Sequence, residues 1–285
     1  MKTVILGGYG QLGTALDTLS SKSVVALSRR DADLTNSDQL FAKLDSLEPQ
    51  ILINCAAYNL VDKAESEPEI AQRLNAEIPG QMAEWCEARG IVFVHFSSDY
   101  VFGGDSHRET PYSESDTPNP VCRYGESKLA GERNVLEACT RPFVIRTCGL
   151  YGPTRSPGKG NFIKTMLSLA ESRKELNVVD DQRCTPTLTF DLAQATLQLI
   201  STSEFGLYHI TNSGSMTWCE LAREVFRLKN CPTLVHPITS AEFGAKARRP
   251  AYSVLDCSKF SQITQVSVPT WQSAVKRYLS LPEIE

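Results

Sequence analysis

Short apolar runs alternate with longer amphipathic stretches through the first half of the chain. The apolar runs predict strands at residues 4–6, 23–27, 51–54, 91–96 and 143–146. The amphipathic stretches predict helices at residues 11–20, 37–47, 69–89 and 124–140. Strands that are apolar throughout and separated by helices are typical of a parallel sheet covered on both faces. With right-handed crossovers, this order predicts an α/β fold built on a doubly wound parallel sheet of the Rossmann type.

The second half of the chain has a less regular pattern. A stretch rich in glycine and proline predicts a loop at 149–161, followed by helices at 162–171, 190–199, 218–228 and 269–279. Short strands are expected at 177–179 and 206–210, and the second of these should return to the main sheet. We therefore expect a dinucleotide-binding Rossmann domain over residues 1–147, completed by about 187–210. A smaller, discontinuous C-terminal substrate lobe should take up most of residues 148–285.

Composition and charge exclude several classes of function. The 285 residues are 41% hydrophobic and 22% charged, which is typical of a globular protein. A net charge of -4 gives no electrostatic footprint for nucleic acid or an anionic membrane, and no apolar run is long enough to span a bilayer. The apolar run near the start is short and ends in glycines, which favours a strand over a signal peptide. We expect a cytoplasmic protein without a nucleic-acid or membrane partner.

The cysteines and histidines do not predict a metal site. Nine cysteines are scattered through the chain, and no two of them form a CxxC pair. Their number is odd, and a chain of this length needs no disulfides for stability. The four histidines show no spacing typical of metal ligands. We therefore expect free thiols and no metal.

A glycine-rich turn follows the first predicted strand and opens the first predicted helix. It contains Gly7, Gly10, Gln11, Leu12 and Gly13, with both GxGxxG and GxxGxxG spacing. Glycines at these positions let backbone N–H groups approach a pyrophosphate at the positive end of the helix. Such turns also occur without ligands, but this place in the fold predicts a dinucleotide site.

The end of the second predicted strand should select the cofactor. Ser28 and Arg29, with Arg30 beside them, stand where an acidic residue would hold the adenosine ribose, and they suit a 2′-phosphate instead. We predict NADPH, with NADH as the alternative if Asp31 or Asp33 binds the ribose hydroxyls. Small residues after the third strand permit close approach of a cofactor, although they also suit plain packing. The remaining expected cofactor contacts are Leu34, Ala56, Ala57 and Tyr58.

Three side chains have the pattern needed for proton transfer to a carbonyl. Tyr124 and Lys128 are four positions apart on a predicted helix and share one face. A neighbouring ammonium should lower the pKa of the tyrosine, so that it can protonate an alkoxide during hydride transfer. Lys128 can also hold the nicotinamide ribose, and Ser98, at a strand end, can bond the same carbonyl oxygen. A lone YxxxK is common on helix surfaces, but the glycine turn and the serine in this order strengthen the prediction.

The motifs resemble the dTDP-4-dehydrorhamnose reductase family of the extended short-chain dehydrogenase/reductase superfamily. The resemblance covers nearly the whole chain. It is carried by VDKAESEP at 61–68, SDYVF at 98–102, YGESKLAGE at 124–132, NFIKTM at 161–166, DQ at 181–182 with PT at 186–187, and RP at 249–250 before Ser253 and Leu255.

The resemblance implies NAD(P)H-dependent reduction of the C4 ketone of a dTDP-linked 4-keto-6-deoxyhexose. It implies a nucleotide-sugar substrate, and a homodimer is one possible assembly. Each implied residue also has a plain structural explanation as a core aromatic or surface charge. The residues that the resemblance places at the substrate are Val61, Asp62, Ser98, Tyr100, Cys148, Asn161, Phe162 and Arg249.

Two positions depart from the family pattern. Similar proteins usually carry an aromatic residue two positions after Thr147, where it packs on the sugar, and here that residue is Gly149. Gly149 should leave open space, which puts the identity of the hexose in doubt. Phe190 stands where some relatives have an acidic residue that bridges a dimer through magnesium, which again predicts no metal.

Two other functions remain open from the sequence. A sugar-nucleotide epimerase or dehydratase on the same scaffold would recycle a tightly held NAD, and the Arg29-Arg30 pair argues against it. A noncatalytic NADP-binding regulatory subunit, similar to the β subunit of methionine adenosyltransferase, would keep the same motifs. Open space at Gly149 would favour that regulatory role.

Overall fold

The computed structural model describes residues 1–20, 23–156, 158 and 160–281. Its centre is a parallel sheet of six strands in the order β2-β1-β3-β4-β5-β8. The sequence predicts this doubly wound architecture correctly. The strands of the sheet are β1 (Thr3–Leu6), β2 (Val24–Leu27), β3 (Ile51–Asn54), β4 (Val92–Ser98), β5 (Pro142–Thr147) and β8 (Gly206–His209).

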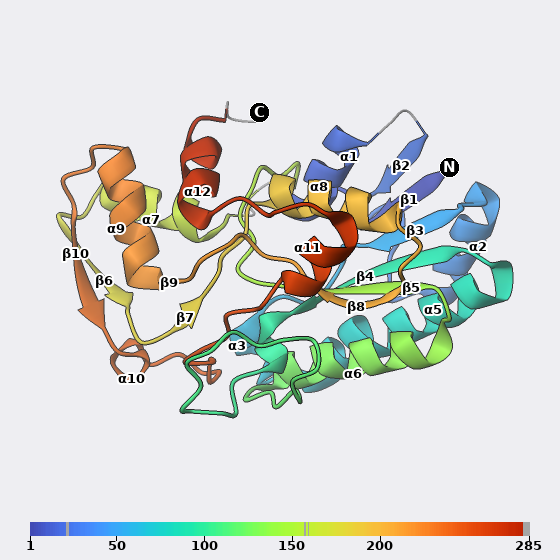
Figure 1. Ribbon diagram of the computed structural model, residues 1–285, viewed down its shortest axis with the longest axis horizontal. Coiled ribbons are helices and arrows are strands. Elements are labelled where there is room, and N and C mark those ends of the chain that lie inside the picture. Colours follow the sequence, from blue (N-terminus) through green and yellow to red (C-terminus); the bar gives the residue numbers. More distant parts are fainter. Residues whose placement is uncertain (21–22, 157, 159, 282–285) are drawn as a thin grey trace.

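Helices cover both faces of the sheet, and each face has its own core (Figure 1). One face packs against α2, α5 and α6 through side chains such as Leu40, Met82 and Val135. The other packs against α1, α8 and α11 through side chains such as Leu16 and Leu192. The helices are α1 (Gln11–Leu19), α2 (Ser37–Leu47), α5 (Ile78–Arg89), α6 (Arg123–Ala138), α8 (Thr189–Ile200) and α11 (Ser258–Thr264).

The helix expected at 69–89 is interrupted. It consists of α4 (Pro68–Gln72), a π-helical turn (Arg73–Glu77) and α5. Pro79 lacks the N–H that would bond the carbonyl of Asn75, and the amide of Ile78 reaches the carbonyl of Arg73 instead. A short helix that was not expected, α3 (Val61–Ala64), precedes this segment.

A third core lies beside the carboxyl end of the sheet, on the left of Figure 1. In it, two short parallel strands pack under helices. The expected strand at 177–179 is part of β6, whereas β10 carries a histidine and a proline and was not expected. These elements are α7 (Phe162–Ala170), β6 (Glu175–Val179), α9 (Trp218–Leu228), β10 (Leu234–Ile238) and α12 (Trp271–Leu279).

Short connecting elements complete this part of the fold. In the loop expected at 149–161, positions 157 and 159 lie outside the described residues, as do residues 282–285 of the expected substrate lobe. The connecting elements are β7 (Arg183–Cys184), β9 (Met216–Thr217), α10 (Ser240–Phe243) and a single helical turn after β4 (Asp99–Val101).

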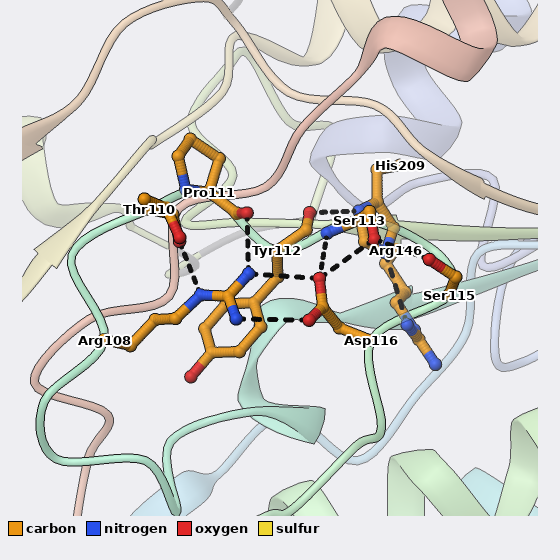
Figure 2. Close-up of polar contacts among 9 residues, drawn as sticks. All are labelled: Arg108, Thr110, Pro111, Tyr112, Ser113, Ser115, Asp116, Arg146 and His209. Atoms are coloured by element: carbon orange, nitrogen blue, oxygen red, sulfur yellow. Dashed lines mark hydrogen bonds and ion pairs between the residues drawn. The ribbon is translucent and has the colours of Figure 1, made fainter.

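The loop between β4 and α6 is tied to the sheet by polar contacts, such as that of the Tyr112 carbonyl with His209 (Figure 2), and by stacked side chains. The guanidinium of Arg108 bonds both carboxylate oxygens of Asp116 at 3.1 Å and lies 4.3 Å above the ring of Tyr112. Tyr112 stacks on Phe102 at 4.0 Å, and Arg146 of β5 lies over the other side of Phe102. This stack joins an exposed loop to a buried strand and so fixes the segment that follows Ser98.

All nine cysteines lie in the described part of the chain and are free thiols, as predicted. Among the described residues, no group of His, Cys, Asp and Glu side chains has the arrangement of a metal site. None of the helices that the structure describes is long and apolar enough to cross a bilayer.

Candidate active site

The predicted glycine turn joins β1 to α1 at the carboxyl edge of the sheet. Gly7 has φ +70°, and a Cβ there would lie 2.9 Å from the backbone nitrogen of Ala56. A Cβ at Gly13 would lie 2.4 Å from the carbonyl oxygen of Gly7, so both positions require glycine. Among the described atoms, a Cβ at Gly10 would meet only that same oxygen, at 3.3 Å, and none of the described side chains caps α1. The turn therefore fits a pyrophosphate at the helix N-terminus.

Gln11 links the glycine turn to the segment after β5. Its Oε1 accepts hydrogen bonds from the amide of Gly152 at 2.9 Å and from Nδ2 of Asn161 at 3.0 Å. Asn161 also donates to the hydroxyl of Tyr278 and caps α7. Asn161, which the resemblance places at the substrate, thus lies beside the glycine turn. The side chain of Leu12 is buried in the core, so its backbone is the part available to a ligand.

The turn after β2 is held by its own acidic residues. Asp31 accepts the hydroxyl of Ser28 at 2.6 Å and its amide at 2.8 Å, and these bonds lower the pKa of Asp31. Asp33 accepts the amide and hydroxyl of Thr35, which lower its pKa in the same way. Arg29 is exposed, and Leu34 packs into the core. With both carboxylates engaged inside the turn, the exposed guanidinium is the better candidate to meet a ribose phosphate.

Asn75, in the π-helical turn, holds the segment after β3 and was not predicted from the sequence. Its Oδ1 accepts the amide of Tyr58 at 2.8 Å, and its Nδ2 donates to the carbonyl of Tyr58 and to the hydroxyl of Ser127 on α6, both at 3.0 Å. Ala56 and Ala57, both half-buried, lie just before this clamp. The signal that could have revealed it is an amide residue between Leu74 and Ala76, four positions before a proline.

The structure brings Ser98, Tyr124 and Lys128 together at the carboxyl end of β4. Ser98 ends the strand, while Tyr124 and Lys128 lie in the first two turns of α6. A side-chain hydrogen bond joins Ser98 and Tyr124. Nζ of Lys128 donates to the carbonyl oxygen of Phe96 at 2.6 Å. The three side chains are 7%, 9% and 2% exposed, respectively, so they form a desolvated cluster.

The protonation behaviour of this cluster differs from the sequence-based expectation. Burial raises the pKa of Tyr124, and the hydrogen bond with Ser98 opposes that rise. Burial also lowers the pKa of Lys128 to about 8, with Glu132 acting in the opposite direction. The expectation of a lowered pKa for Tyr124 is therefore wrong for this state, because burial raises it and the charge of Asp99 adds to the rise. A phenol that keeps its proton at neutral pH is the form that can donate it.

Asp99 is a second buried acid at the site, and it too was not predicted. Its carboxylate accepts the hydroxyl of Ser98 at 3.0 Å and the hydroxyl of Ser253 at 2.6 Å. Cys148 provides a further side-chain hydrogen bond, and burial raises the pKa of Asp99 despite all three. Asp99 therefore orients the hydroxyl of Ser98. The available signal was an acidic residue directly after a buried strand.

Four residues expected at the substrate are linked to Tyr124 directly or through Tyr100. The ring of Tyr100 meets that of Tyr124 edge to face at 5.5 Å. Arg249 forms an ion pair of 2.9 Å with Asp62 and a side-chain hydrogen bond with Tyr100. Val61 packs in the same small cluster as Tyr124. Residues far apart in sequence thus meet at Tyr100, whose ring contacts Tyr124.

The space expected at Gly149 is filled. Gly149 has φ +50°, and a Cβ there would lie 3.1 Å from Cη2 of Trp218 and from Cβ of Pro186. Phe162 packs on Trp218 with ring centroids 4.8 Å apart. Cys148 is buried beside Asp99. The expectation of open space at Gly149 is wrong because the indole of a helix distant in sequence occupies it.

Comparison with known proteins agrees with this geometry. A family model described as "RmlD substrate binding domain" matches residues 1–283. A dTDP-4-dehydrorhamnose reductase of Aggregatibacter actinomycetemcomitans is 35% identical over 99% of both chains. A probable dTDP-4,6-dihydroxy-2-methyloxan-3-one 4-ketoreductase of Streptomyces antibioticus is 39% identical over 100% of this chain and 96% of its own. The crystal structure of dTDP-4-dehydrorhamnose reductase from Bacillus anthracis in complex with NADP is 36% identical, with a TM-score of 0.93 over 98% of this chain and 99% of its own.

The parallel sheet, its glycine turn and these similarities define an NAD(P)H-dependent oxidoreductase of the extended short-chain dehydrogenase/reductase class. Catalysts of this class place a proton donor and a dinucleotide at the carboxyl edge of one sheet. Within the class, the chain belongs to the dTDP-4-dehydrorhamnose reductase family.

Proposed function

We propose that this protein reduces the C4 ketone of a dTDP-linked 4-keto-6-deoxyhexose in dTDP-L-rhamnose synthesis. The observation that carries the proposal is the convergence of Ser98, Tyr124 and Lys128 at the end of β4, at the same edge of the sheet as a turn shaped for a pyrophosphate. NADPH, when bound, supplies the hydride that reaches the ketone carbon. NADP in the Bacillus anthracis relative supports this choice of cofactor.

Different residues of the chain bind the cofactor and donate the proton. The glycine turn (Gly7, Gly10, Gln11, Leu12 and Gly13) holds the diphosphate, Ser28 and Arg29 hold the ribose phosphate, and the segment 56–58 lines the nicotinamide side. Tyr124 donates its phenolic proton to the ketone oxygen. Ser98, whose hydroxyl is directed to Asp99, keeps the phenol in place. Lys128 binds the nicotinamide ribose.

The substrate contacts follow from the cluster around Tyr124. We place Tyr100, Val61 and Asp62 at the hexose and Arg249 at the diphosphate, because Tyr100 and Val61 pack with Tyr124 and the other two are bonded to each other beside Tyr100. We assign residues 148–285 mainly to this substrate lobe and residues 1–147, with 187–210, to the dinucleotide domain. A cytoplasmic location agrees with nine free thiols, which persist in reducing compartments.

A direct assay tests the proposal. Purified protein is mixed with NADPH and a panel of nucleotide-linked 4-keto-6-deoxyhexoses, and the absorbance of the reduced nicotinamide is followed. We expect oxidation of NADPH with the dTDP-linked ketosugar and slower or no oxidation with other bases. Absence of turnover with every ketosugar would refute the proposal. The filled position at Gly149 removes the feature that favours a noncatalytic role.

A further inference from the structure

The indole of Trp218 reaches the edge of the sheet where Ser98 lies. β5 ends at Thr147, which pairs in register with Ser98 at the end of β4. Gly149 lies two residues further along, and the place where its Cβ would be is 3.1 Å from Cη2 of Trp218. An aromatic ring from another part of the chain therefore stands next to the carboxyl ends of β4 and β5, which is where ligands of such sheets bind.

The position of this indole is fixed by its helix. Trp218 is the first residue of α9, directly after the N-cap Thr217. Thr217 and Glu220 form a reciprocal capping box, and the hydroxyl of Thr217 also donates to Asp180 of the neighbouring segment. These bonds set where α9 begins, so they also set the height at which the indole meets Gly149.

Trp218 and Phe162 form a partly open aromatic pair. Phe162 is the first residue of α7, and its ring lies at 47° to the indole with centroids 4.8 Å apart. Both side chains are half-buried, whereas Trp271, in the core of the same lobe, is only 9% exposed. The pair thus keeps apolar surface available at the edge of the site.

Polar groups follow directly from the residue before Gly149. The buried thiol of Cys148 contacts Asp99, and Asp99 in turn bonds Ser98 beside Tyr124. An apolar surface near a few convergent polar groups suits a sugar ring, which has an apolar face of C–H bonds and a polar rim of hydroxyls. We propose that Trp218, supported by Phe162, is the aromatic surface on which the hexose ring packs, and that it determines selectivity for the hexose. This inference rests on the proposed function.

Binding measurements separate the contribution of the sugar from that of the nucleotide. The affinities of dTDP and of the dTDP-linked 6-deoxyhexose product are measured by calorimetry in the presence of NADP. The ratio of the two affinities reports contacts to the hexose. We expect Trp218→Ala to lower this ratio about tenfold while dTDP alone binds as before. Trp218→Phe should retain most of the ratio, and Trp271→Phe, which removes a tryptophan from the core, should not change it.

A second variant tests the contact from the other side. In Gly149→Ala the new methyl group would stand 3.1 Å from the indole and should displace it, lowering the ratio as Trp218→Ala does. Adding Trp218→Phe, with its shorter ring, should restore part of the loss. An unchanged ratio in folded Trp218→Ala protein would overturn this inference and leave the proposed function standing. A wild-type protein that does not distinguish the dTDP-hexose from dTDP, and does not reduce the ketosugar, would overturn the proposed function as well.

Discussion

The carboxylate of Asp99 accepts a 2.6 Å hydrogen bond from the hydroxyl of Ser253, which lies 154 positions further along the chain. The other carboxylate oxygen accepts the hydroxyl of Ser98 at 3.0 Å. Ser253 is itself held by β7, because its amide donates to the carbonyl of Arg183 at 2.9 Å. One buried acid thus connects the end of the main sheet to the strand pair beside it.

This connection predicts an effect of Ser253 on the reaction. Ser253→Ala removes a donor from a buried carboxylate, so the pKa of Asp99 should rise further and Ser98 should lose its fixed orientation. We expect kcat to fall about tenfold, since a hydrogen bond to a charged group is lost. Ser253→Thr keeps the hydroxyl and should retain most of the rate. Equal rates for the alanine variant and wild type would show that Asp99 does not act through Ser98.

Removal of the phenolic hydroxyl should affect catalysis and spare binding. Tyr124→Phe deletes the proposed proton donor, and we expect kcat to fall about 10²–10⁴-fold. Titration with NADPH should give the same affinity as wild type, because the glycine turn is untouched. Tyr151→Phe is the matched control, since the hydroxyl of Tyr151 is buried and has no hydrogen-bond partner among the described residues. Full activity in Tyr124→Phe would require another proton donor.

The ammonium of Lys128 should make stability depend on pH. Its pKa is lowered to about 8 by burial, below the value of 10.5 for a free lysine. Between about pH 8 and pH 10.5 the unfolded chain binds more protons than the folded one, so this group makes the folded state gain stability as pH rises. Below pH 8 the destabilisation from burying the charge is complete.

Lys128→Met isolates that contribution. Other groups titrate in the same range, so the quantity to measure is the difference in unfolding free energy between the variant and wild type. We expect the unfolding free energy of the variant, taken relative to that of wild type, to fall by about 3 kcal/mol between pH values below 8 and about pH 10.5. Urea unfolding at several pH values measures it. A difference that stays constant over this range would contradict a lowered pKa for Lys128.

The sequence predicts those parts of the fold and site that depend on local signals. The expected strand at 51–54 is Ile51–Asn54, because a run of apolar residues between turns is a sufficient signal for a buried strand. The glycine turn is equally local, since Gly7 and Gly13 are required by neighbours within a few residues and by the adjacent strand end.

The parts that the sequence does not predict depend on contacts between distant residues. Asn75 binds Tyr58 and Ser127, 17 and 52 positions away, and Asp99 binds Ser253. Desolvation also reversed the direction expected for the pKa of Tyr124, because burial is a property of the folded chain. The contact between Trp218 and Gly149 was not predicted for the same reason. The sequence around Trp218 predicts the start of a helix, but it does not indicate which distant residue the indole covers.

Arg29, which is exposed after β2, should determine the preference for NADPH over NADH. Arg29→Ala removes a guanidinium that we assign to the 2′-phosphate, which NADH lacks. We expect kcat/KM with NADPH to fall at least about tenfold while kcat/KM with NADH stays the same. Arg133→Ala, which removes an exposed arginine of α6, is the control for charge. Equal losses with both cofactors would place Arg29 away from the 2′-phosphate.

Breaking the buried ion pair between Arg146 and Glu132 should lower the unfolding free energy more than breaking an exposed ion pair. Its two hydrogen bonds are 2.8 and 2.7 Å long, and both side chains are 2% exposed. Arg146 also contacts the ring of Phe102 and Nε2 of His209. Replacing one partner leaves the other charge buried without compensation, so we expect Arg146→Met to lower the unfolding free energy by about 3–5 kcal/mol.

The double variant distinguishes an uncompensated charge from lost packing. Arg146→Met with Glu132→Leu removes both charges and keeps the volume similar, so most of the stability should return. Arg227→Met breaks the exposed pair with Glu224 on α9 and should leave the urea midpoint unchanged. A double variant as unstable as Arg146→Met would show that the loss comes from the packing of Arg146 against Phe102. The stack that fixes the loop after Ser98 would then depend on that contact.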